Sequence, residues 1–176
     1  MQKPVLISCL ILLFSLVVPV GAKNKEEVIL KRPIMSLDIA MRAAHGALKE
    51  CRKRGYSVAV AVVDSSGVLQ VLLRDHLGGP HTIETATRKA WTAVSFRQST
   101  GELADFLKRG QIPSQIPHNP GVLIVGGGYK IDWNGQMVGG IGVSGAPPGK
   151  SDVDSIDGAC ALAGIQEVRQ QLDFAE

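Results

Sequence analysis

The sequence is poor in aromatic residues, in cysteine and in net charge. Phe, Trp and Tyr make up 5% of the 176 residues, too few for a surface on which nucleic-acid bases stack. The formal net charge of +3 is small and spread along the chain, so we expect no nucleic-acid partner. The three cysteines form no C-x-x-C motif, which excludes a thioredoxin-type redox motif and a zinc ribbon.

The remaining composition is that of an ordinary globular chain. Hydrophobic residues make up 45% of the sequence and charged residues 20%, which is enough apolar material for a packed core. The length suits one domain and is short for two. We expect a single domain over residues 36–176, preceded by a polar lead-in over residues 23–35.

The first 22 residues have the pattern of a secretory signal peptide. Lys3 precedes an apolar run over residues 5–18, and small residues follow up to Ala22. An uncleaved anchor is the alternative, but the run is shorter than the roughly 20 residues of a membrane span. We therefore predict cleavage after Ala22, no stable membrane insertion after it, and a periplasmic or secreted protein.

Cys51 and Cys160 remain after cleavage, and export would determine whether they can form a disulfide. An oxidising compartment permits a disulfide between them. Two buried free thiols are the alternative, because free cysteine packs as a small hydrophobic residue. The sequence leaves both possibilities open.

Hydrophobic periodicity and turn residues predict an α/β (α+β) domain. The expected helices cover residues 37–54, 82–97, 100–109 and 152–172, and the expected strands cover 57–64, 68–74, 121–125, 129–133 and 136–144. The order is α-β-β-α-α-β-β-β-α. Because short turns join consecutive strands, we predict a five-stranded antiparallel sheet with helices on both faces.

Glycines at 140, 142 and 145 match the G-x-G-x-x-G pattern of dinucleotide-binding loops. The match lies inside an expected strand and runs into Pro147 and Pro148 rather than into a helix. Without a helix N-terminus there are no oriented N–H groups for a pyrophosphate, so we expect no nucleotide cofactor. We predict that these glycines let a helix or a neighbouring subunit pack closely against the sheet.

The helix expected over residues 82–97 carries the candidate site. If it extends back to His81, then His81, Thr85, Arg88 and Thr92 share one face. Arg88 would lie about 10.5 Å along the helix from His81, roughly the width of a porphyrin. This spacing suits His81 as an iron ligand, with Arg88 or Lys89 contacting haem propionates.

Several blocks together resemble the GlcG/HbpS-like haem-binding family. They are residues 58–64 with Gly67, residues 89–93, the three glycines 126–128, and residues 138–145. The same domain type occurs at the C-terminus of PduO-type corrinoid adenosyltransferases. The resemblance spans about residues 37–172. It implies a profilin-like domain, homo-oligomers, and a tetrapyrrole site near residues 79–92 with threonine or histidine on the iron.

The residues and the resemblance together predict an exported haem-binding protein for sensing, storage or delivery. The expected cofactor is haem b. The expected contacts are His81, Thr85, Arg88, Lys89 and Thr92, with His81 on the iron, Thr92 as an alternative and His118 as a reserve ligand.

Two other functions remain open. One is an enzyme or accessory protein acting on a small hydroxy acid, a diol or a corrinoid-related metabolite, with acid–base chemistry from His76, His81, Asp75 or Asp105. The other is a ligand-free module that assembles through its glycine-rich strands. Asp152, Asp154 and Asp157 suggest favourable charges at a helix start more than a metal site.

Overall fold

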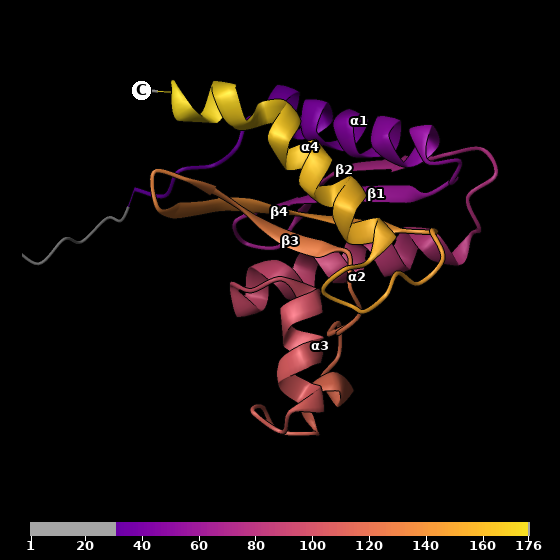
Figure 1. Ribbon diagram of the computed structural model, residues 1–176. Coiled ribbons are helices and arrows are strands. Elements are labelled where there is room, and N and C mark those ends of the chain that lie inside the picture. Colours follow the sequence, from indigo (N-terminus) through magenta and orange to yellow (C-terminus); the bar gives the residue numbers. More distant parts are fainter. Residues whose placement is uncertain (1–30, 176) are drawn as a thin grey trace, which may run out of the picture. The chain divides into compact units, whose positions relative to one another are not determined.

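Within residues 31–175, which the computed structural model describes, four antiparallel strands form one sheet in the order β2-β1-β4-β3 (Figure 1). Strands β1 (Ala59–Asp64) and β2 (Leu69–Arg74) form one hairpin, and β3 (Gly128–Trp133) and β4 (Gln136–Ser144) form the other. The two hairpins join because β1 pairs with β4. The central strands β1 and β4 are almost entirely buried, as the apolar sequence of β1 predicts.

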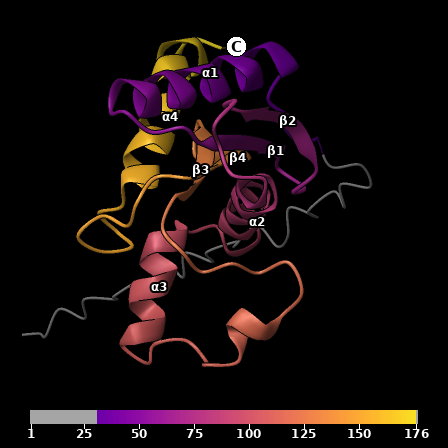
Figure 2. The same cartoon turned by 90° about the vertical axis from the view of Figure 1, so that its right-hand side faces the viewer.

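Helices cover both faces of this sheet, as expected. Helices α1 (Leu37–Lys53) and α4 (Ile156–Asp173) lie on one face, and α2 (His81–Phe96) lies on the other (Figure 2). Helix α3 (Thr100–Lys108) follows α2 and leads into an irregular segment that contains one 3-10 turn, Ile116–His118. The prolines of that segment account for its lack of longer elements.

The main core lies between the sheet and the pair α1 and α4. Val60 and Val62 of β1 and Ile141 of β4 pack there against alanines of α1. A disulfide between Cys51 and Cys160 joins the two helices, with their Cα atoms 5.5 Å apart. The structure therefore contains the disulfide that the sequence left open.

Helix α2 approaches the other face through small residues. Ala86 and Ala90 pack on Ala59 and Ala61. A Cβ atom added at Gly142 would lie 2.1 Å from the carbonyl oxygen of Ala86, so only glycine permits this contact. The prediction that the β4 glycines allow close helix packing is confirmed.

The fifth predicted strand, over residues 121–125, is wrong. The backbone there bonds to side chains of α2: Arg88 donates to the Val122 carbonyl, and the Leu123 N–H donates to Thr92. These bonds replace the pairing that a strand would require, so residues 31–175 contain four strands where five were expected.

The last helix begins later than predicted. Residues 152–155 precede α4, and the Ser155 hydroxyl accepts a hydrogen bond from the Gly158 N–H at 3.0 Å. A serine at this position caps a helix, so α4 begins at Ile156.

The predicted signal segment, residues 1–22, lies outside the described residues, as does most of the lead-in over residues 23–35. In the described part of the chain, no helix is both long and apolar enough to cross a membrane. From Arg32 onwards the described residues form one compact unit.

The disulfide joins positions 109 residues apart in sequence, which leads to a stability prediction. Replacing both Cys51 and Cys160 with serine should lower the free energy of unfolding by about 2–4 kcal/mol, because the unfolded chain gains entropy. Urea denaturation measures this change. A reductant should destabilise the wild type and leave the double variant unaffected; equal sensitivity of the two would contradict the assignment.

Candidate functional site

Helix α2 begins at His81, the extension that the proposed ligand-binding face requires. The His81 side chain is exposed, and Thr85 one turn later is half-buried, with its hydroxyl donating to the His81 carbonyl at 2.9 Å. The N-terminal half of the predicted face is therefore open to solvent.

The C-terminal half of the same face is covered by residues 121–123. Arg88 Nη2 donates to the Val122 carbonyl at 2.8 Å, and Arg88 Nη1 lies 3.5 Å from Glu84. Thr92 is fully buried and accepts a hydrogen bond from the Leu123 N–H at 2.9 Å. Thr92 therefore offers no exposed oxygen to an iron atom in this conformation, while Arg88 remains partly exposed.

Lys89 lies inside the molecule. It is 2% exposed, and its ammonium group donates to the Val143 carbonyl at 3.0 Å and to Asp157 Oδ2 at 2.9 Å. An assignment of Lys89 to a haem propionate does not fit this position. The helical register could have indicated it, because Lys89 shares a face with the buried residues Ala86 and Ala93.

The sequence indicates for Asp157 only a favourable charge at the start of a helix. It does lie in the first turn of α4, but it also accepts a hydrogen bond from the Ala146 N–H through Oδ1, at 3.0 Å. Together with Lys89 it ties α2, β4 and α4 to one another. Sequence reasoning missed this pair because 68 residues separate the two side chains.

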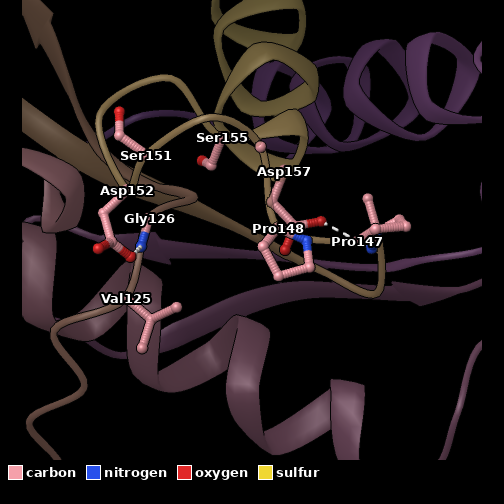
Figure 3. Close-up of a pocket in the computed structure, with 10 residues that line it drawn as sticks. Val125, Gly126, Pro147, Pro148, Ser151, Asp152, Ser155 and Asp157 are labelled. Carbon is pink, nitrogen blue, oxygen red and sulfur yellow. Dashed lines mark hydrogen bonds between the residues drawn. The ribbon is translucent and has the colours of Figure 1, made fainter.

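A pocket of about 250 Å³ lies beside Asp157 (Figure 3). Its wall combines apolar side chains, including Pro147, Pro148 and Val125, with the carboxylate groups of Asp152 and Asp157. Asp152 accepts hydrogen bonds from the Gly126 N–H at 3.3 Å and from Lys108 at 2.8 Å. Each carboxylate thus has one lysine partner, so the two pairs are close to neutral.

Burial raises the pKa of Asp152, but the hydrogen bonds from Lys108 and Gly126 outweigh it and hold that pKa below its ordinary value. The carboxylate is therefore ionised at neutral pH and acts as an acceptor. Among residues 31–175, no three His, Cys, Asp or Glu side chains are grouped so that they could hold a metal ion.

A second polar cluster lies where β2 runs into the loop before α2. Asp75 is 4% exposed and accepts hydrogen bonds from Arg52 Nε at 2.7 Å and Arg52 Nη2 at 3.2 Å. Hydrogen bonding to Arg52 lowers the pKa of Asp75 to about 2. His76 Nδ1 lies 3.0 Å from the same carboxylate. These residues border a hollow of about 340 Å³ with Gly55, Tyr56 and Ser57.

The segment from Leu72 to Ile83 also carries exposed apolar side chains. Leu77 is 75% exposed, and Leu72 and Ile83 are 36% exposed each. His76 and His81 lie within the same segment, and both are exposed. His118 is exposed too, but it lies in the 3-10 turn of the proline-rich segment.

The fold and these polar clusters define an α+β domain with an antiparallel sheet between a disulfide-joined helix pair and one close-packed helix. The chain belongs to the family described as "Haem degrading protein HbpS-like", whose model matches residues 35–166.

Solved structures of similar proteins support this membership. A double mutant of HbpS from Streptomyces reticuli is 37% identical, with a TM-score of 0.71 over 85% of this chain and 95% of that one. A structure described as a PduOC:heme complex is 26% identical, with a TM-score of 0.67 over 76% of this chain and 94% of that one.

Relatives found by sequence similarity also support the family membership. Corrinoid adenosyltransferase PduO of Salmonella typhimurium is 31% identical over 121 residues, which are 68% of this chain and 36% of that protein. The match thus spans about a third of PduO. Protein GlcG of Escherichia coli K12 is 29% identical over 68% of this chain and 84% of its own length.

The buried ion pair leads to a stability prediction with a matched control. Lys89→Met leaves the Asp157 carboxylate buried without its cation, so the free energy of unfolding should fall by about 3–5 kcal/mol. Lys108→Met removes the more exposed partner of Asp152 and should cost less than about 1 kcal/mol. Urea denaturation at neutral pH measures both, and equal effects would show that the Lys89 pair has no special role.

Proposed function

We propose that this protein is an exported haem-binding protein that serves in sensing, storage or delivery. The observation that carries the proposal is the segment from Leu72 to Ile83, which exposes three apolar side chains and two histidines. A porphyrin has two apolar faces and an iron that imidazole binds, so this combination suits it. The side chains of Arg74, which is exposed, and of Arg88, which is partly exposed, have guanidinium groups that suit the carboxylates of haem propionates.

Similar proteins support the choice of ligand. The family description names haem, and one similar structure is described as a heme complex. The chain has no C-x-x-C-H motif, the sequence typical of covalent haem attachment, and Cys51 and Cys160 are joined to each other. Non-covalent binding of haem b is therefore part of the proposal, with His81, Thr85 and Arg88 as candidate contacts.

Export and self-association belong to the same proposal. A disulfide between α1 and α4 favours an oxidising compartment, the periplasm or the extracellular space. Strand β2 lies at an edge of the sheet, and the exposed side chains of Val68 and Leu69 lie at its start. Unpaired edge strands and exposed apolar residues are common features of contacts between copies, which favours a homo-oligomer.

Hemin titration of the purified protein tests the proposal. Wild type should shift the Soret band, and Leu77→Asp and Ile83→Asp should each weaken binding about tenfold, because each removes an apolar contact with the porphyrin. Leu162→Asp, at an exposed position on α4, is the control and should bind like wild type. Absence of hemin binding by wild type would refute the proposal. An equal loss of hemin affinity in all three variants would show that the haem site lies outside the segment from Leu72 to Ile83.

The pocket in Figure 3 favours a second candidate function, binding of a small hydroxylated metabolite. Asp152 and Asp157 offer acceptors for hydroxyl groups, and their lysine partners already balance their charge. A neutral diol therefore suits the pocket better than a hydroxy acid, whose carboxylate would meet two others.

A thermal shift assay separates the two ligands. A diol at about a hundred times its dissociation constant should add about 2.7 kcal/mol of stability, and Asp152→Asn should reduce that gain. A larger effect of a hydroxy acid than of the matched diol would contradict the charge argument.

A further inference from the structure

His76 differs from the other histidines of the described chain in its surroundings. Within residues 31–175, it is the histidine whose ring forms a hydrogen bond with a carboxylate group, between Nδ1 and Asp75 Oδ1 at 3.0 Å. The backbone N–H of His76 donates to the same oxygen, also at 3.0 Å. The ring is therefore held at two points relative to Asp75.

This contact determines which ring nitrogen carries the proton. Arg52 pairs with Asp75 through two hydrogen bonds, so Asp75 is a carboxylate with no proton to donate. His76 Nδ1 must then be the donor. In the neutral imidazole, the lone pair is therefore on Nε2.

An imidazole that donates from one nitrogen to a carboxylate and offers the other nitrogen outward is the usual arrangement of a metal-binding histidine. The hydrogen bond orients the ring and makes the free nitrogen a stronger ligand. The His76 side chain is 83% exposed and borders the hollow formed with Arg52 and Tyr56, so a large planar group can reach it. Leu77, next in sequence, supplies an exposed apolar contact.

The surroundings of His81 are different. Its Cε1 edge faces Gly79 so closely that a Cβ atom there would lie 2.6 Å away. In the described chain, no carboxylate forms a hydrogen bond with the His81 ring. His81 therefore lacks the support that orients His76.

We propose that His76, through Nε2, is the axial ligand of the haem iron, and that Asp75 is the residue that positions it. This inference rests on the proposed function and replaces His81, the ligand expected from the sequence. His81 then does not ligate the iron. Arg52 holds the carboxylate in place through its two hydrogen bonds.

Ferric hemin titrations of the purified chain with the variants His76→Ala and His81→Ala test the assignment. Electron paramagnetic resonance and the Soret band report ligation. His76→Ala should lose the imidazole-ligated spectrum, and added imidazole should restore it, whereas His81→Ala should keep the wild-type spectrum. His76 is exposed, so its removal should leave the melting temperature unchanged, which circular dichroism checks.

Asp75→Asn tests the positioning role. The ligand remains but loses its charged acceptor, so hemin affinity should fall about tenfold. The iron–histidine stretching band of the ferrous protein, measured by resonance Raman spectroscopy, should move to lower frequency. A purely structural role for Asp75 would leave that band in place.

The outcomes separate the two proposals. If wild type binds no hemin, both the proposed function and the ligand assignment fail. If wild type binds and His76→Ala keeps the imidazole-ligated spectrum, the proposed function stands and the assignment to His76 is overturned. Loss of that spectrum in His81→Ala alone would restore the ligand expected from the sequence.

Discussion

The arrangement of this domain depends on one buried ion pair, between Lys89 of α2 and Asp157 of α4. The ammonium group of Lys89 donates one hydrogen bond to the Asp157 carboxylate and another to the carbonyl oxygen of Val143, near the end of β4. A buried charge is tolerated only with such partners. The same aspartate holds the loop that begins at Ala146, so the pair sets where α2, β4 and α4 meet and forms part of the pocket wall.

Most of the fold could be predicted from local patterns, because hydrophobic periodicity and turn residues act over a few neighbours. One example is the turn at Asn134 and Gly135 that joins β3 to β4, and another is Ser36, whose hydroxyl accepts a hydrogen bond from the Ile39 N–H at the start of α1. The conformation of residues 121–125 could not be predicted in this way. Their apolar sequence suits a strand, but their backbone forms hydrogen bonds with the side chains of Arg88 and Thr92. Long-range side-chain contacts of this kind leave no periodic trace in the sequence.

The candidate site could be predicted less completely for the same reason. Periodicity predicted a helix over residues 82–97, and the structure adds His81 as its first residue, the extension that the grouping of polar residues on one face required. Helical spacing could not reveal that the backbone at Leu123 covers Thr92. Nor could it reveal that Asp75, itself held by Arg52 of α1, orients the His76 ring. The chemistry of an imidazole depends on such partners, which come together only when distant segments fold.

The helices on the two faces of the sheet are held in place by different interactions. On one face, a covalent bond between Cys51 and Cys160 holds α1 and α4 together. On the other, α2 packs through close alanine and glycine contacts and is joined to α4 by the ion pair between Lys89 and Asp157, which is not covalent. A native-state opening that frees α2 must therefore break this ion pair, but it leaves the covalent link between α1 and α4 intact.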